Sequence, residues 1–155
     1  MTRKMLFAGL ALAFAFLPVI DIAHSQDSGK KVVSSPNAPE AIGPYSQAIR
    51  AGKTLYLAGQ VAIDPKTKKF MADASIEEQT RQTLDNLKAV LEADGLTMDN
   101  VVSTSVFLQD LNDFGKMNQV YGTYFKTAPP ARATVQVAKL PLGAMVEISA
   151  IAVAP

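Results

Sequence analysis

Two adjacent prolines, Pro129 and Pro130, divide the C-terminal part of the chain. Proline has a fixed φ and no backbone N–H, so neither residue fits inside a helix or a central strand, and the element before them must end there. After the prolines, polar residues alternate with apolar ones: Arg132, Thr134 and Gln136 against Ala133, Val135 and Val137. This period of two predicts a half-buried strand whose polar face begins with an arginine.

An arginine at the start of a strand has two interpretations. The planar guanidinium of Arg132 can bind a substrate carboxylate through two parallel hydrogen bonds. It can also form a structural ion pair or remain an exposed charge, and the stretch by itself favours this second interpretation. The rest of the sequence has to decide between them.

Further strands follow from runs of branched and aromatic residues. We expect an edge strand from Lys31 to Ser34 and a hairpin whose strands lie within 42–49 and 54–63. Two more strands are expected over 101–108 and 145–154. Within the hairpin, Gly59 indicates a bulge or a close approach of another group to the backbone.

The strongest helix signal runs from Ser75 to Asp94. Ser75 can cap the helix, Glu78 completes a capping box, and Gly95 ends it. Residues at helical spacing form one buried stripe: Ile76, Thr80, Leu84, Leu87 and Leu91.

A second helix is expected over 112–125, with Asn112 as its N-cap. Its buried side is predicted to consist of Phe114, Met117, Tyr121 and Phe125. The order of elements then predicts an α+β domain: a single sheet with two helices on one face. The opposite face of the sheet would have no cover within one chain, so association of several copies through that face is expected.

Residues 1–25 are predicted to be a signal peptide, because a short basic start precedes an apolar run over 5–20 and small residues before Gln26. The run is shorter than the ~20 apolar residues of a membrane-spanning helix, and an uncleaved anchor is the second interpretation. We therefore expect a periplasmic or secreted protein, with a flexible segment at 26–33 and the folded domain at 34–155.

Composition excludes several classes of function. The only histidine, His24, lies in the predicted signal peptide, and there is no cysteine, which excludes Ser–His and Cys–His catalysis and His-based metal sites in the mature chain. No glycine-rich phosphate loop is present. Cleavage would leave 13 basic and 13 acidic side chains, which gives no electrostatic case for nucleic acid or membrane partners.

The last predicted strand contains one carboxylate, Glu147, opposite an apolar face of Val146, Ile148, Ala150 and Ala152. A carboxylate in so apolar a strand is costly unless it is paired or takes part in chemistry. Glu147 is therefore either the structural partner of Arg132 or of a lysine, or a catalytic group.

Six ordered segments carry a family resemblance: 41–47 (Ala-Ile-Gly-Pro-Tyr-Ser-Gln), 58–60 (Ala-Gly-Gln), 81–87 (Arg-Gln-Thr-Leu-Asp-Asn-Leu), 106–114 (Val-Phe-Leu-Gln-Asp-Leu-Asn-Asp-Phe), 130–132 (Pro-Ala-Arg) and 146–152 (Val-Glu-Ile-Ser-Ala-Ile-Ala). Through them the chain resembles the Rid (YjgF-type) family, the reactive intermediate deaminases, from about Ser34 to Val153. The resemblance implies a chorismate-mutase-like fold, a homotrimer with an active site in each cleft between subunits, and no cofactor.

The resemblance also implies roles for individual residues. Arg132 would hold the substrate carboxylate and Glu147 would stand beside the catalytic water. Tyr45, Gly59 and Asn118 would line the cleft and contact the substrate.

Two positions depart from the pattern of the family. Many members have serine where this chain has Ala58, and many have cysteine where it has Thr134. The loss of the serine hydroxyl removes a hydrogen-bonding group from the expected pocket and bears on rate or substrate range.

The function implied is that of a 2-iminobutanoate/2-iminopropanoate deaminase-type hydrolase, which converts 2-aminoacrylate-type enamines and the corresponding imines to 2-oxo acids and ammonia. A non-catalytic binding or chaperone-like protein of the same fold is the alternative. A ribonuclease is a third hypothesis, against which the neutral charge of the mature chain argues. Beyond a small substrate and further copies of the chain, no partner is expected.

Overall fold

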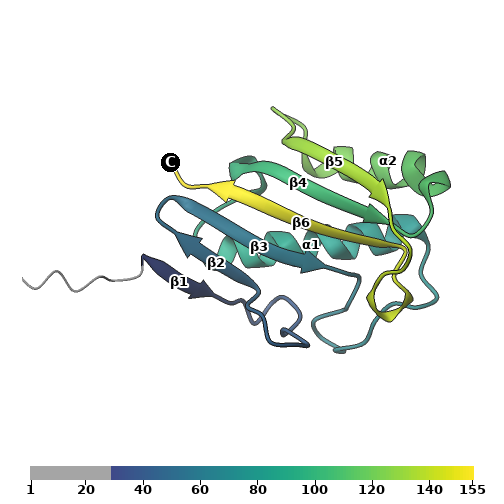
Figure 1. Cartoon of the computed structure of the whole chain (residues 1–155), viewed down its shortest axis with the longest axis horizontal. Helices are drawn as coiled ribbons and strands as arrows, with labels where there is room; N and C mark the ends of the chain where they lie inside the picture. Colours follow the sequence, from purple (N-terminus) through teal and green to yellow (C-terminus); the bar gives the residue numbers. More distant parts are fainter. Residues whose placement is uncertain (1–28) are drawn as a thin grey trace, which may run out of the picture.

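The computed structural model describes residues 29–155; the predicted signal peptide and its cleavage site lie outside them. Six strands form one sheet in the order β1-β2-β3-β6-β4-β5 (Figure 1). The strands are β1 (Lys30–Val33), β2 (Ala48–Ala51), β3 (Thr54–Gln60), β4 (Val101–Leu108), β5 (Ala131–Gln136) and β6 (Val146–Val153). All neighbouring strands are antiparallel except β4 and β5, which are parallel.

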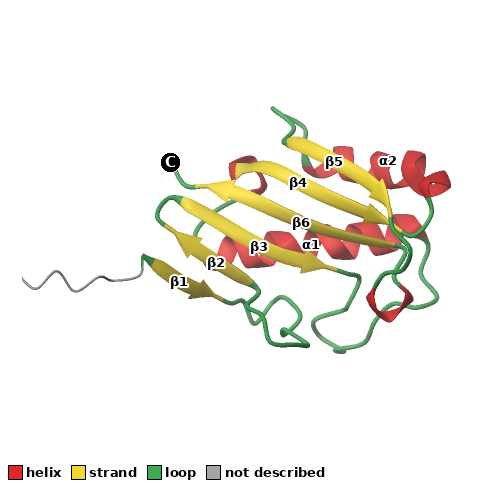
Figure 2. Ribbon diagram, viewed as in Figure 1, coloured by secondary structure: helices red, strands yellow, loops and turns green. Residues whose placement is uncertain are grey.

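Both long helices, α1 (Ile76–Ala93) and α2 (Phe114–Tyr124), lie behind the sheet in the view of Figure 2. Three short 3₁₀ turns at 98–100, 111–113 and 141–143 complete the described structure. The apolar stripe of α1 packs on the inward residues of β3 and β6, such as Leu55 and Ile148, which are fully buried. The predicted α+β fold of the chorismate-mutase type, with two helices on one face of one sheet, is confirmed.

The sheet begins earlier than the predicted domain. Strand β1 starts at Lys30 and pairs with β2, so half of the segment 26–33 predicted to be flexible is an edge strand. This agrees with the edge strand expected from Lys31 to Ser34.

Helix α1 has the predicted capping box. The Ser75 hydroxyl accepts a hydrogen bond from the Glu78 N–H (3.3 Å), and the Glu78 carboxylate accepts one from the Ser75 N–H (2.8 Å). These bonds to the charged form lower the pKa of Glu78. Gly95 follows the helix with a φ of +72°, a conformation that glycine adopts without strain.

The start of α2 differs from the prediction. Asp110 accepts a hydrogen bond from the Asn112 N–H (2.8 Å) and caps the turn at 111–113, so Asn112 is not the N-cap of the helix. Phe114 occupies the first turn of α2 and is 39% exposed, with its ring beside the Arg132 guanidinium and not in the core. The other three predicted core residues of this helix, Met117, Tyr121 and Phe125, are buried.

Strand β5 is more exposed than predicted. Because β5 is the edge strand and the face opposite the helices is uncovered, Val135 is 46% exposed and β5 is not half-buried. Other apolar side chains are exposed on this open face: Tyr56, Val102 and Val153. Among the described residues, nothing covers the face, as the sequence predicted.

Candidate active site

A bulge in β3 creates the site around Glu147. The pairing of β3 with β6 shifts register between Leu57 and Gln60, which confirms the predicted irregularity at Gly59. A Cβ atom added to Gly59 would lie 2.9 Å from Cδ of Glu147, closer than Cβ atoms approach other groups. The absence of a side chain at position 59 therefore lets the glutamate lie across the backbone of β3.

Glu147 points to the open face of the sheet. It pairs with Phe107 of β4, whereas its neighbours Val146 and Ile148 are buried beneath the helices. The Glu147 carboxylate has no hydrogen bond or ion pair with any residue in the described part of the chain. Burial of the side chain raises its pKa above the ordinary value for a glutamate.

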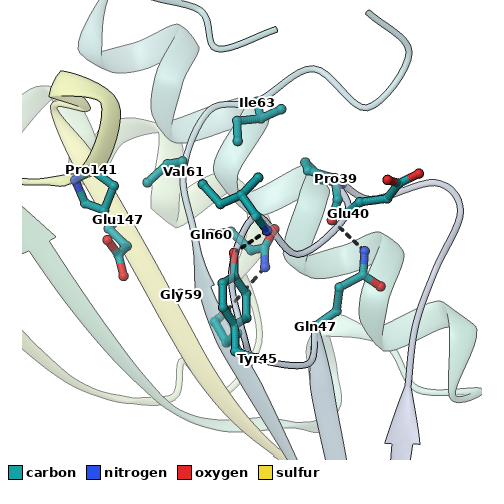
Figure 3. Close-up of a pocket in the computed structure, with 12 residues that line it drawn as sticks. Pro39, Glu40, Tyr45, Gln47, Gly59, Gln60, Val61, Ile63, Pro141 and Glu147 are labelled. Carbon is teal, nitrogen blue, oxygen red and sulfur yellow. Dashed lines mark hydrogen bonds between the residues drawn. The ribbon is translucent and has the colours of Figure 1, made fainter. Parts of the chain in front are cut away.

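A cavity of about 400 Å³ extends from Glu147 (Figure 3). Tyr45 and Gly59 line it, as the resemblance implied, and the Tyr45 hydroxyl accepts a hydrogen bond from the Ile42 N–H at 3.3 Å. Most of the other lining residues are apolar: Pro39, Ile42, Ala58, Val61, Ile63 and Pro141. Ala58 contributes a methyl group to this wall.

Two buried amide side chains hold the loops that form the walls of this cavity. The Gln47 amide donates to the Pro39 carbonyl at 2.6 Å and fixes the loop before β2. The Asn86 amide donates to the carbonyls of Val61 (3.1 Å) and Ile63 (3.0 Å) and fixes the loop after β3. Sequence reasoning missed both roles, although both residues lie in the segments that carry the resemblance.

Arg132 belongs to a different part of the structure. Its guanidinium carbon lies 4.5 Å from the ring centroid of Tyr121 and 5.6 Å from that of Phe114, both on α2. The Tyr121 hydroxyl is hydrogen bonded to Thr104 at 2.7 Å, which fixes the ring beneath the arginine. Burial raises the pKa of Tyr121, so the hydroxyl stays neutral.

The stacked guanidinium is not neutralised. Arg132 forms no ion pair with any described residue, so its expected alternative role as a structural ion pair is not observed. A second cavity lies beside it, lined by Asn118, Tyr121, Pro130 and Arg132 among others. Two residues from Arg132 along β5, the Thr134 hydroxyl oxygen is buried and has no hydrogen-bond partner in residues 29–155.

The structure therefore divides the predicted site residues into two groups. Tyr45, Gly59 and Glu147 line one cavity, and Asn118 and Arg132 line the other. The register of β4 with its neighbours places the two groups on opposite faces: Arg132 pairs with buried Thr104, and Glu147 pairs with Phe107, three residues further along the same strand. Within one chain, these groups cannot bind one small molecule together.

The described domain is similar to known proteins in both sequence and fold. Residues 35–154 match the protein family described as Endoribonuclease L-PSP. A protein of the Rid family from Yersinia pestis, YyfA, has a solved structure that is 48% identical, with a TM-score of 0.78 over 81% of this chain and 99% of that one. The chain belongs to the Rid family.

Other Rid-family relatives have names that refer to a ligand or reaction. The 2-iminobutanoate/2-iminopropanoate deaminase of mouse (Mus musculus) is 50% identical over 124 residues, which cover 80% of this chain and 91% of the relative. The solved structure of TdcF from E. coli with bound serine is 38% identical, with a TM-score of 0.77 and coverage of 81% of this chain and 99% of that one.

Proposed function

We propose that this Rid-family protein hydrolyses 2-imino acids and their enamine tautomers to 2-oxo acids and ammonia. The observation that carries the proposal is the Glu147 carboxylate, which lines a cavity of about 400 Å³ without a hydrogen bond or ion pair to another described residue. A relative 50% identical to this chain is named as a deaminase of such imines. The serine bound to TdcF is an amino acid with the same carboxylate and a nitrogen on the neighbouring carbon.

The reaction needs little from the protein, because the imine carbon is already electrophilic. Water adds to the carbon of the C=N bond and Glu147 accepts a proton from that water. The resulting carbinolamine receives that proton on nitrogen from Glu147, and its C–N bond breaks as ammonia leaves. The C=O bond forms as the hydroxyl group gives its proton to the Glu147 carboxylate. One water molecule is consumed, and the raised pKa of Glu147 brings this base closer to neutral pH.

Arg132 would hold the substrate carboxylate, but from another copy of the chain. Its guanidinium is held by the two aromatic rings of α2 and retains free N–H donors. These donors suit bidentate binding of a carboxylate. We propose a homotrimer in which the edge strand β5 of one copy lies against the open sheet face of the next, so that Arg132 of the first copy approaches Glu147 of the second. Such an arrangement would also cover the exposed side chains of Tyr56, Val102 and Val153.

Ammonia release tests the proposed reaction. An L-amino-acid oxidase generates 2-imino acids in situ, and the mature protein should accelerate the appearance of ammonia over the spontaneous rate. Glu147→Gln is the control, because it keeps the shape of the side chain and removes the proton acceptor. No acceleration by a folded wild-type oligomer would contradict the deaminase and favour the non-catalytic or chaperone-like alternative.

Two further points belong to the same proposal. The description of the family names an endoribonuclease, so RNA cleavage is measured on the same preparations. The absence of histidine from the mature chain and its balanced charge favour the imine hydrolase over a ribonuclease.

Export through the signal peptide would place the enzyme in the periplasm or outside the cell, near an oxidase or lyase that releases imines.

A further inference from the structure

A second groove shares part of its wall with the cavity at Glu147. This groove has a volume of about 260 Å³ and lies between the loop at 36–42 and the loop at 63–68. Four residues line both spaces: Pro39, Glu40, Ile42 and Ile63. In Figure 3, Pro39 and Ile63 lie across the cavity from Glu147, so the groove opens at the end remote from the carboxylate.

The chemistry of the groove selects an apolar occupant. Three prolines line it, and their rings offer no N–H donor. The remaining lining residues are mostly apolar: Ala38, Ala41, Ile42 and Ile63. The charged residues Glu40 and Lys68 form an ion pair with each other at 3.1 Å, both largely exposed to solvent.

The groove is also built before any ligand binds. The prolines fix φ in the 36–42 loop, and the Gln47 amide holds that loop through the carbonyls of Ala38 and Pro39. Asn86 holds Ile63 on the opposite side. A preformed apolar groove binds a flexible chain without the cost of ordering its own walls.

The space available is larger than the smallest imino acids need. The cavity at Glu147 alone, at about 400 Å³, falls in the range of pockets that hold drug-sized ligands. A 2-iminopropanoate molecule, whose side chain is one methyl group, would leave the groove empty. The methyl group of Ala58, in place of a serine hydroxyl, makes the wall of the cavity apolar as well.

From these observations we infer that the groove binds the side chain of the substrate, and that the preferred substrates are 2-imino acids with extended aliphatic side chains. The inference rests on the proposed function, since it places the imine carbon at Glu147 and the carboxylate at Arg132 of another copy. The side chain of the imino acid, which is the remaining substituent of the imine carbon, then extends past Ile42 and Ile63 into the groove.

The test compares imino acids made in situ from alanine, norvaline and norleucine. Burial of each additional methylene contributes ~0.8 kcal/mol, so kcat/KM should rise about 4-fold per methylene along the series. Ala41→Phe fills the groove without reaching the cavity at Glu147, because Ala41 lines the groove and does not line that cavity. The substitution should abolish the rise of kcat/KM with the length of the substrate side chain. It should change kcat/KM for the alanine-derived imine less than about 2-fold.

The matched control is Ala93→Phe, the same substitution at an exposed alanine at the end of α1, away from both spaces. It should leave the whole series unchanged. Binding of the stable products 2-oxopropanoate and 2-oxohexanoate, measured by calorimetry on the same oligomers, examines the groove without catalysis. The wild type should bind 2-oxohexanoate more tightly than 2-oxopropanoate. The Ala41→Phe variant should bind the two acids equally.

The outcomes separate the two proposals. Equal rates for all three imines with equal binding of both oxo acids would overturn the groove while leaving the deaminase intact. A chain-length effect on oxo acid binding without acceleration of any imine would support the groove and overturn the proposed reaction. Retention of the chain-length effect in Ala41→Phe would place the side chain elsewhere and overturn the inference.

Discussion

Replacement of Gly59 by alanine should separate the effect on activity from the effect on stability. The added methyl group would meet the Glu147 side chain, with Cδ at 2.9 Å and Cγ at 3.1 Å. Gly59 does not have a φ in the left-handed region, so alanine fits the backbone there. The three atoms nearest to the added methyl group all belong to the flexible side chain of Glu147.

The magnitudes of the two effects are expected to be very different. Rotation of Glu147 away from its preferred position costs roughly 0.5–1.5 kcal/mol. The loss of chain entropy in the unfolded state stabilises an alanine variant by about 0.4–1 kcal/mol, so the net change in the free energy of unfolding should stay within about 1 kcal/mol. A misplacement of about 1 Å in the catalytic carboxylate, however, should lower kcat about 100-fold.

The assay is imine hydrolysis coupled to an amino-acid oxidase, together with the melting temperature of each variant. Gly115→Ala is the matched control, because a Cβ atom there has no neighbour within 4 Å. It should retain wild-type kcat. In a Glu147→Gln background, Gly59→Ala should lower kcat less than about 3-fold further, because both substitutions act on the same carboxylate.

Two results would refute this reasoning. Wild-type kcat in Gly59→Ala would show that the position of Glu147 does not matter for the reaction. If the fold-decrease in kcat of the double variant equals the product of the fold-decreases of the two single variants, Gly59 acts through something other than Glu147.

Four further predictions concern the arginine and the ring beneath it, the glutamate, and the N-terminus. Tyr121→Leu removes the ring beneath Arg132 and should raise KM about 3- to 10-fold with little change in kcat, whereas Tyr121→Phe keeps the ring and should stay near wild type in steady-state kinetics. Arg132→Lys loses the planar donors and should lower kcat/KM about 10- to 150-fold; full activity of a folded variant would contradict the carboxylate role. Because burial raises the pKa of Glu147, its ionisation disfavours the folded state, and stability falls as pH rises through that pKa. Glu147→Gln should therefore melt at a higher temperature than the wild type near pH 7, with the difference vanishing below about pH 4; equal melting curves at all pH values would contradict the desolvation of Glu147. Mass spectrometry of the exported protein should find Gln26 at the N-terminus, and an intact Met1 in membrane fractions would show that the segment is an uncleaved anchor.

Features governed by neighbours in the sequence could be predicted well. The capping box of Ser75 and Glu78 and the bulge at Gly59 depend on local hydrogen bonds and local sterics, and the structure contains both. The cap of the second helix was predicted wrongly because Asp110 and Asn112 are both good caps and lie two residues apart. The exposure of Phe114 follows from its place beside Arg132, a residue distant in the sequence.

Features that depend on tertiary structure could not be predicted from patterns. Gln47 and Asn86 are polar residues that a pattern would place on the surface, yet they are buried because loop carbonyls need donors there. The separation of Arg132 from Glu147 depends on the pairing of β4 with both β5 and β6, and no single strand reveals it. The resemblance identified the candidate residues, and the sheet register places them on opposite faces of one chain, which is why the proposed site draws on two copies.

Complementation between two inactive variants tests most directly whether the site is shared between copies. Arg132→Ala and Glu147→Gln are each expected to be inactive as pure oligomers. In an equal mixture, the copy that supplies Arg132 must be the Glu147→Gln variant, and the copy that supplies Glu147 must be the Arg132→Ala variant. Each condition is met in half of cases, so about one quarter of the sites in co-refolded oligomers are intact. The account predicts recovery of about one quarter of the wild-type rate of imine hydrolysis. No recovery in mixed oligomers of verified composition would contradict it, because residues that act from the same chain cannot complement each other.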